Sequence, residues 1–357
     1  MTRRRSAALA VLLSLPGVAI VSAQVVQPPY DSSYTVTDLG AVPGLPAPYG
    51  GLTFLPSNSN TIVIGGAANN VSGALYSIGV VRGAGSHITG FTGSVAAYSE
   101  GQYNDGGVVF GPGGVLFYTR YPVNQVGEVK PGSVVNDKIV DLTPLGISSS
   151  VGALNFVPAG FPGAGQLKIV SYNTGDWYTA TYTSDGTGTF NITSPVLNTT
   201  INVGPEGFVY VPPGSPVFPS GTSLLVSEYG NNVVATYQVD GSGNPIPASR
   251  AVFVNGLTGA EGAVIDPVTG DFLFSTFGAA NHVIAVRGFA IPNTPTPGAG
   301  ATATPTPTRT QTPTPTRTQT PIVSGVPAVV PTLSLPMLVL LGVMLAGGAF
   351  WMIARRS

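Results

Sequence analysis

The chain contains no cysteine among its 357 residues. This absence excludes a thiol nucleophile, a disulfide framework, a zinc site built on cysteine and a lipidated N-terminal cysteine. Histidine is scarce as well, because His87 and His282 are the only two. They fall in different repeats, in loop-like segments that the repeat pattern places on opposite faces. The sequence therefore argues against a two-histidine metal site and against a Ser-His-Asp triad.

Charged residues make up only 8% of the chain, and they are unevenly distributed. All 15 acidic residues lie between residues 24 and 290, where only seven basic residues accompany them. This part of the chain therefore has a net charge near −8, which is 7 minus 15. Nucleic acid and anionic membrane surfaces both require a basic face, so the sequence predicts neither as a partner of this region.

The N-terminal segment has the three parts of an export signal. Arg3, Arg4 and Arg5 form a basic region, residues 7–20 are apolar, and residues 21–23 are small residues suited to cleavage. We expect residues 1–23 to be a signal peptide and Gln24 to be the first mature residue. An uncleaved anchor is the weaker alternative, because the apolar core is short and contains Pro16.

The C-terminal segment predicts a membrane anchor. Residues 337–353 carry no charge and reach the lower limit of the ~17–25 residues that a membrane-spanning helix needs. Arg355 and Arg356 follow and would stay in the cytoplasm. We therefore expect an exported protein of the cell envelope or cell surface, held by this helix at least until processing.

Residues 330–334 read Val-Pro-Thr-Leu-Ser. Together with the helix and the arginines, this motif resembles the bacterial IPTL-CTERM sorting signal, a relative of the PEP-CTERM signals. The resemblance covers residues 330–356, and it implies a processing protease of the exosortase type as a partner. Val330 replaces the usual isoleucine, and Leu335-Pro336-Met337 stands where many members have a Glu-Trp-Gly-like stretch. A plain single-span anchor is the alternative, and it also predicts a surface protein.

The segment before the anchor is rich in threonine and proline, and it twice reads Thr-Pro-Thr-Arg-Thr-Gln-Thr-Pro. Such a sequence favours extended, solvated conformations and cannot assemble a core. The sequence thus divides into a signal peptide (1–23), a folded ectodomain (24–290), a disordered stalk (291–329) and a sorting motif with helix and basic tail (330–357).

The ectodomain contains an internal repeat. Each copy opens with glycine, continues with alternating apolar residues and often ends in proline; the copies begin at Gly51, Gly107, Gly152, Gly207 and Gly262. Their spacings of 56, 45, 55 and 55 residues are near the period of four-stranded propeller blades. In four copies a later apolar strand ends in Ser or Thr with an aromatic residue close behind: Thr119 and Tyr121, Ser171 and Tyr172, Ser227 and Tyr229, and Ser275 and Phe277. Polar turns and further strands follow.

The last copy lacks its fourth strand, whereas residues 34–39 form an unassigned strand at the start of the ectodomain. Pairing residues 35–38 with residues 283–286 would complete the last blade and remove exposed edges. We therefore predict an all-β fold, a single β-propeller of five blades, with six as the alternative. Residues 227–233 resemble the strand-turn-strand of NHL-type and gluconolactonase-like propellers.

In a propeller, the loops before each first strand and after each second strand share one face, which we call the loop face. The predicted ligand-binding residues on it are Asp105, Arg120, Asp176, Trp177, Glu228, Asn231, Asn232 and His282. Glu206 and Glu261 both directly precede a repeat glycine, so their carboxylates could converge on a calcium ion. The resemblance to gluconolactonase-like enzymes also implies a metal at the channel mouth, although their Asn and Asp ligands have no match here. The alternative is that each glutamate accepts backbone N–H bonds in a tight turn.

The sequence shows no catalytic set, so a non-enzymatic function is favoured. The leading hypothesis is a surface propeller that binds a protein or glycan through its loop face. A calcium-dependent lactonase-like hydrolase is the alternative, and a structural component of the envelope or matrix is the third possibility.

Overall fold

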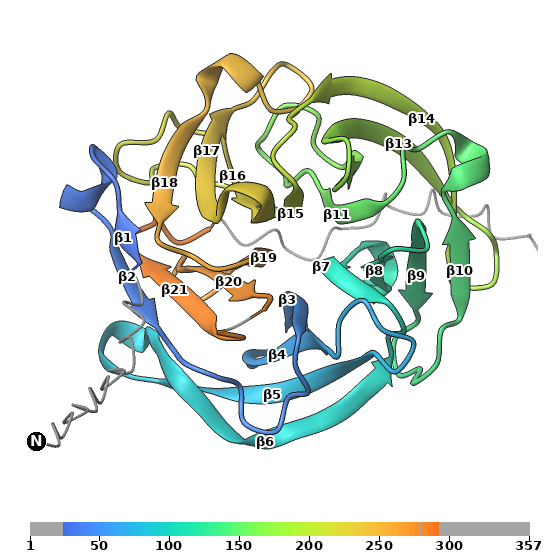
Figure 1. Cartoon of the computed structure of the whole chain (residues 1–357), viewed down its shortest axis with the longest axis horizontal. Coiled ribbons are helices and arrows are strands. Elements are labelled where there is room, and N and C mark those ends of the chain that lie inside the picture. The colour runs from blue at the N-terminus through green and yellow to red at the C-terminus, as the bar shows by residue number, and fades with distance from the viewer. Residues whose placement is uncertain (1–23, 279, 293–357) are drawn as a thin grey trace, which may run out of the picture. The chain divides into compact units, whose positions relative to one another are not determined.

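Each copy of the repeat forms one antiparallel sheet, because its apolar residues alternate with the period of a strand. A computed structural model describes residues 24–278 and 280–292, and Figure 1 shows the five sheets arranged as blades around a central axis. Blade 1 consists of β3 (Tyr49–Leu55), β4 (Asn58–Gly66), β5 (Ala74–Arg82) and β6 (Ile88–Glu100). Blade 2 consists of β7 (Asn104–Phe110), β8 (Leu116–Arg120), β9 (Gln125–Val129) and β10 (Lys138–Asp141). Blade 3 consists of β11 (Val151–Phe156), β12 (Leu167–Ser171), β13 (Asp176–Ser184) and β14 (Phe190–Thr200).

The last two blades include strands from the start of the described chain. Blade 4 consists of β15 (Pro205–Tyr210), β16 (Ser223–Glu228), β17 (Val233–Gln238), β18 (Ala251–Asn255) and β1 (Val25–Val26). Blade 5 consists of β19 (Ala260–Ile265), β20 (Phe272–Thr276), β21 (Val283–Arg287) and β2 (Thr35–Asp38). In the described part of the chain, six single 3₁₀ turns lie between strands: η1 (Tyr30–Ser32), η2 (Ala84–Ser86), η3 (Pro112–Gly114), η4 (Thr143–Leu145), η5 (Tyr229–Asn231) and η6 (Pro247–Ser249).

The ring closes as predicted from the sequence. Strand β2 pairs with β21 in antiparallel register, with Val36 opposite Val286 and Asp38 opposite Ile284. Asp38 Oδ2 also lies 2.8 Å from His282 Nδ1, at the end of the same strand pair. The five-bladed propeller is confirmed, and the six-bladed alternative is wrong.

The N-terminal segment adds a contact that was not predicted from the sequence. Val25 pairs with Asn255 and Val26 with Val254, so β1 is a fifth strand on the outer edge of blade 4. The chain then continues to β2 in blade 5. On the way, Tyr34 packs edge-on against Phe253, with ring centroids 5.4 Å apart. The first fifteen described residues therefore join blades 4 and 5.

The repeat glycines allow the inner strands to meet at the axis. Neighbouring inner strands contact one another around the whole ring, and β19 contacts β3. A Cβ atom at Gly51 would lie 2.3 Å from the carbonyl oxygen of Gly106, and one at Gly207 would lie 2.5 Å from that of Glu261. Both distances are below van der Waals contact, so a side chain at either position would push two blades apart.

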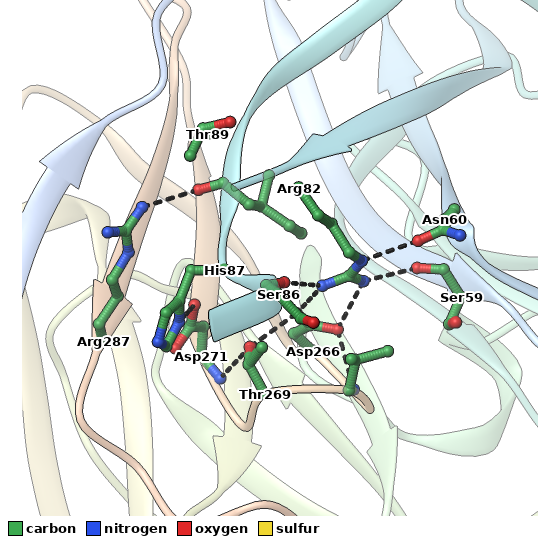
Figure 2. Close-up of polar contacts among 12 residues, drawn as sticks. Ser59, Asn60, Arg82, Ser86, His87, Thr89, Asp266, Thr269, Asp271 and Arg287 are labelled. Atoms are coloured by element: carbon green, nitrogen blue, oxygen red, sulfur yellow. Dashed lines mark hydrogen bonds and ion pairs between the residues drawn. The ribbon is translucent and has the colours of Figure 1, made fainter. Parts of the chain in front are cut away.

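A polar seam joins the first blade to the last (Figure 2). Arg82 of β5 forms a two-pronged ion pair with Asp266 in the β19–β20 turn, with Nη1–Oδ2 and Nη2–Oδ1 distances of 2.6 and 3.0 Å. The Asp266 side chain is fully buried. Beside it, His87 Nδ1 lies 2.7 Å from Asp271 Oδ2. Bidentate Arg–carboxylate pairs fix both distance and orientation, so this seam sets how blade 1 meets blade 5.

Replacing Asp266 with alanine is expected to destabilise the protein by about 2 kcal/mol, because the Arg82 guanidinium would lose its only carboxylate in the seam. The guanidinium would keep its bonds to Asn60 and to the backbone, which limits the loss. Urea unfolding followed by circular dichroism measures the effect. Lys130→Met is the matched control, since it breaks an ion pair whose lysine is 39% exposed, and it should change stability by less than about 0.5 kcal/mol. Equal losses in the two variants would contradict a structural role for the seam.

Within residues 24–278 and 280–292, no helix is long and apolar enough to cross a membrane. The predicted signal peptide, the stalk after its first two residues, and the predicted sorting motif and anchor lie outside the described residues.

Candidate metal centre and loop face

Each inner strand is irregular where it enters the sheet. The register against the second strand shifts between Tyr49 and Leu52, Asn104 and Val108, Val151 and Ala153, Pro205 and Gly207, and Ala260 and Ala263. Bulges of this kind redirect side chains and are common next to functional sites. In blades 2, 4 and 5 the bulge contains an acidic residue, namely Asp105, Glu206 and Glu261. The corresponding segments of blades 1 and 3 contain none.

The three acidic side chains meet at the axis and form what we call the axial carboxylate cluster. One oxygen from each of Asp105, Glu206 and Glu261 lies within 4.8 Å of the others, and these residues are 0, 5 and 1% exposed. Asp105 Oδ2, Glu206 Oε2 and Glu261 Oε1 have no hydrogen-bond partner. Asn69 supplies one donor with its amide group turned, since its nitrogen then lies 2.9 Å from Asp105 Oδ1. Turn capping alone does not account for buried carboxylate oxygens that accept no hydrogen bond.

The electrostatics of the axial carboxylate cluster follow from its burial. Burial raises the pKa of Asp105 to about 7. Burial and the negative charges of the other members raise the pKa of Glu206 well above its usual value. Burial and the charge of Asp105 do the same for the pKa of Glu261. Near neutral pH the cluster therefore requires bound protons or a cation, because three adjacent buried anions are strongly unfavourable.

Four aromatic side chains lie beside the axial carboxylate cluster, and we call them the aromatic belt. Each is the first residue after the second strand of its blade, and each is half-buried: Tyr121, Tyr172, Tyr229 and Phe277. Successive ring centroids lie 5.6, 5.8 and 5.9 Å apart in edge-to-face contacts. Burial and then the charge of Glu206 raise the pKa of Tyr172 to about 12, which reflects how near this side chain lies to the cluster. Blade 1 has Ala67 at the corresponding position, so the aromatic belt has no member from this blade.

Three of the predicted ligand-binding residues are occupied by contacts with other parts of the fold, either within one blade or between neighbouring blades. Glu228 is fully buried, and its carboxylate pairs with Arg250 at 2.6 Å. Trp177 is fully buried and packs against Phe208, with ring centroids 4.5 Å apart. Arg120 is 6% exposed and donates through Nε to the carbonyl oxygen of Gln102.

The remaining predicted residues lie in or beside loops of the loop face, and none of them is a member of the cluster. Asp176 accepts hydrogen bonds from Ser148 and Thr200, and His282 pairs with Asp38. Asn231 donates to Glu228, and Asn232 accepts from the backbone N–H of Gly259. The structure thus brings only Asp105 to the two glutamates that were predicted as metal ligands.

A shallow polar depression lies beside the aromatic belt, between blades 3 and 4. It has a volume of about 330 Å³ and is lined by Tyr172, Asn173, Asn202, Val203, Gly204, Gly230 and Asn231. Asn173 and Asn202 were not among the residues predicted from the sequence. Asn173 directly follows Tyr172 in the loop after β12, and Asn202 lies in the loop before β15; both loops belong to the sets that form the loop face, and this is the signal that could have identified them.

No protein-family model matches the chain, and no curated protein matches it. Solved structures resemble it in fold at low sequence identity. A calcium structure of a Trichoderma reesei protein of carbohydrate-active enzyme family AA12 is 10% identical, with a TM-score of 0.44, covering 75% of this chain and 98% of that one. An auxiliary nutrient binding protein from Bacteroides thetaiotaomicron is 13% identical, with a TM-score of 0.40 and coverages of 71 and 76%. The PQQ-bound aldose sugar dehydrogenase of Streptomyces coelicolor is 13% identical, with a TM-score of 0.37 and coverages of 70 and 83%.

Proposed function

We propose that this protein is a calcium-binding β-propeller that binds a protein or glycan ligand through its loop face. The observation that carries the proposal is the axial carboxylate cluster, with its three buried oxygens that have no hydrogen-bond partner. Calcium prefers oxygen ligands, takes about six to eight of them, and binds carboxylates in one- or two-oxygen modes. Asp105, Glu206 and Glu261 would hold the ion, whose charge would offset most of theirs.

An ion at this place would act on the loop face through the blades. Its ligands come from blades 2, 4 and 5, and they lie in bulges directly beside the aromatic belt. Fixing the bulges would hold Tyr121, Tyr172 and Tyr229 in place, since these side chains contact one another edge-to-face beside the bulges. Phenol groups and the neighbouring amides are suited to hydrogen bonds with a polar ligand. We therefore expect ligand binding to depend on calcium.

Calcium binding can be measured by titration calorimetry on the full chain, together with the melting temperature in calcium and in chelator. We expect saturable binding and a rise in melting temperature of about 5 °C or more at saturating calcium. Glu206→Gln and Glu261→Gln should each abolish most of that rise, since each removes an anionic ligand. Glu100→Gln, at an exposed carboxylate, is the control and should retain it. Absence of both binding heat and a chelator effect in the unmodified protein would refute the proposal.

A calcium-dependent lactonase-like hydrolase is the second candidate, because the same three carboxylates would hold its metal. Hydrolysis additionally requires a metal coordination position that water and substrate can reach. The ligands are at most 5% exposed, which favours a role in holding the fold and the loop face. Calcium-dependent hydrolysis of gluconolactone that is lost in Glu206→Gln would favour the hydrolase; calcium binding without turnover would favour the binding protein.

A further inference from the structure

A second cavity lies towards the opposite end of the inner strands from the carboxylate cluster. The inner strands β7, β15 and β19 begin at the cluster and run to this end, where Val109, Tyr210 and Ile265 contribute to the lining. The cavity encloses about 240 Å³. This volume is just below the ~300–1,000 Å³ of common ligand pockets, so the cavity is suited to a molecule of one or two rings.

Two long loops form the wall of this cavity. In blades 3 and 4 the first and second strands are joined by residues 157–166 and 211–222, whereas blades 1, 2 and 5 use only residues 56–57, 111–115 and 266–271. The long loops contribute Pro158, Phe161, Pro212 and Pro213 to the lining. Phe161 contacts Tyr210 with ring centroids 5.1 Å apart. Long loops on a rigid scaffold are common carriers of binding sites.

Both loops are held in place by contacts with other parts of the fold. On the blade 3 side, the hydroxyl of Tyr182 donates to the carbonyl oxygen of Gly165 in the 157–166 loop, at 2.9 Å. The 211–222 loop receives a hydrogen bond from the Tyr34 hydroxyl at the Pro216 carbonyl oxygen, 2.6 Å away. Ser215 of the same loop accepts a bond from the backbone N–H of Ala290. The cavity is therefore preorganised, which lowers the entropic cost of binding.

The lining determines the chemistry of the ligand. None of the described residues that line the cavity is charged. The amide of Asn155 is already used, since it donates to the Phe208 carbonyl oxygen at 2.9 Å and accepts from the Phe156 N–H at 2.8 Å. A charged ligand would lose its hydration here without gaining a partner. We infer that this cavity binds a small, uncharged and mostly apolar ring compound, at a site separate from the loop face.

The probe for this inference is 2-naphthol, followed by its fluorescence on titration with the protein. Its anionic analogue 2-naphthoate has a similar shape and a charge. We expect the full chain to bind 2-naphthol and to bind 2-naphthoate at least about tenfold more weakly, because the carboxylate would be desolvated. No binding of 2-naphthol, or equal binding of the two probes, would overturn the inference.

Two variants place the binding in the cavity. Ala263→Phe fills it from β19 and should weaken 2-naphthol binding at least about tenfold, and Phe161→Ala, which removes a wall without adding bulk, should weaken it several-fold. Ile139→Phe, at a 45% exposed position on the outer strand β10, is the control and should bind as the unmodified protein does. Circular dichroism shows whether each variant is folded. Unchanged binding in a folded Ala263→Phe or Phe161→Ala variant would overturn the inference.

Two further measurements complete the test. The first asks whether the cavity is filled by a segment of the protein itself, and the second asks whether 2-naphthol binding is independent of calcium binding. Residues 24–292 contain every strand of the closed ring, so a chain ending at Pro292 retains the whole described fold. If 2-naphthol binds this shorter chain but not the full chain, the cavity belongs to the protein's own C-terminal segment, and the inference is wrong. Glu206→Gln should lose the calcium effect and keep 2-naphthol binding, so the two proposals can fail independently.

Discussion

Gly106→Ala is expected to destabilise the protein by at least about 3 kcal/mol or to prevent folding, although it adds only one methyl group. A Cβ atom at Gly106 would lie 1.9 Å from the carbonyl oxygen of Glu206 and 2.5 Å from its carbonyl carbon. Both atoms belong to the backbone of β15, so no side-chain rotation can relieve the clash. Blades 2 and 4 would have to separate at the axis, where all five inner strands are packed together.

Urea unfolding measures this loss, and Gly90→Ala is the matched control. Gly90 also lies in a strand, the outer strand β6, and a Cβ atom there would meet nothing within 4 Å. We expect Gly90→Ala to change stability by less than about 1 kcal/mol in either direction. If the two substitutions had the same effect, the close approach of β7 and β15 at the axis would not be the reason for glycine at position 106.

The same packing explains why the sequence predicted the fold well. Gly51, Gly152, Gly207 and Gly262 recur because neighbouring inner strands approach too closely at these positions for a side chain, and this requirement imposes a period that can be recognised in the sequence. The closing strand β2 was predictable because the last repeat lacked a partner for β21. Strand β1 was not, because a strand of two residues has no periodicity and is defined only by its pairing with β18.

The candidate site was only partly predictable. Glu206 and Glu261 were identified because each directly precedes a repeat glycine. The repeat pattern placed Asp105 in the same set of loops as the two glutamates. It did not identify Asp105 as a metal ligand, because Asp105 is one residue further from its repeat glycine and the bulge of blade 2 spans more residues. Glu228 was assigned to the loop face from its position at a strand end. Its partner Arg250 is 22 residues away, and only the folded blade brings the two together.

A substitution at the axial carboxylate cluster is expected to stabilise the metal-free protein. At about pH 8 and in chelator, Asp105→Asn should raise the free energy of unfolding by about 3 kcal/mol. The pKa of Asp105 is about 7 in the folded protein, against an ordinary value of 3.8, because the side chain is buried. The unmodified protein must therefore keep this group protonated or bury a further negative charge, whereas asparagine is neutral at every pH.

The pH dependence has a defined sign. Between about pH 4 and pH 7 the folded state binds more protons at Asp105 than the unfolded state does, so the free energy of unfolding falls as the pH rises. This stabilising contribution of Asp105 is fully present below its pKa in the unfolded state. It is lost as the pH rises through its pKa in the folded state. Glu206 and Glu261, whose pKa values are also raised, act in the same direction. Asp105→Asn should therefore flatten the fall in melting temperature between about pH 5 and pH 8.

Calcium should make the unmodified protein more stable than Asp105→Asn, which reverses the order of stability expected in chelator. The ion replaces the protons at the cluster, so saturating calcium should stabilise the unmodified protein most strongly at high pH and have little effect on Asp105→Asn. Glu128, whose pKa burial raises to about 7, lies outside the cluster and should contribute the same pH dependence to both proteins. Asp31→Asn, at an exposed aspartate, is the control and should match the unmodified protein in chelator and in calcium. If Asp105→Asn is less stable than the unmodified protein in chelator at high pH, the three carboxylates are satisfied within the fold, and neither protons nor calcium are needed to hold them together.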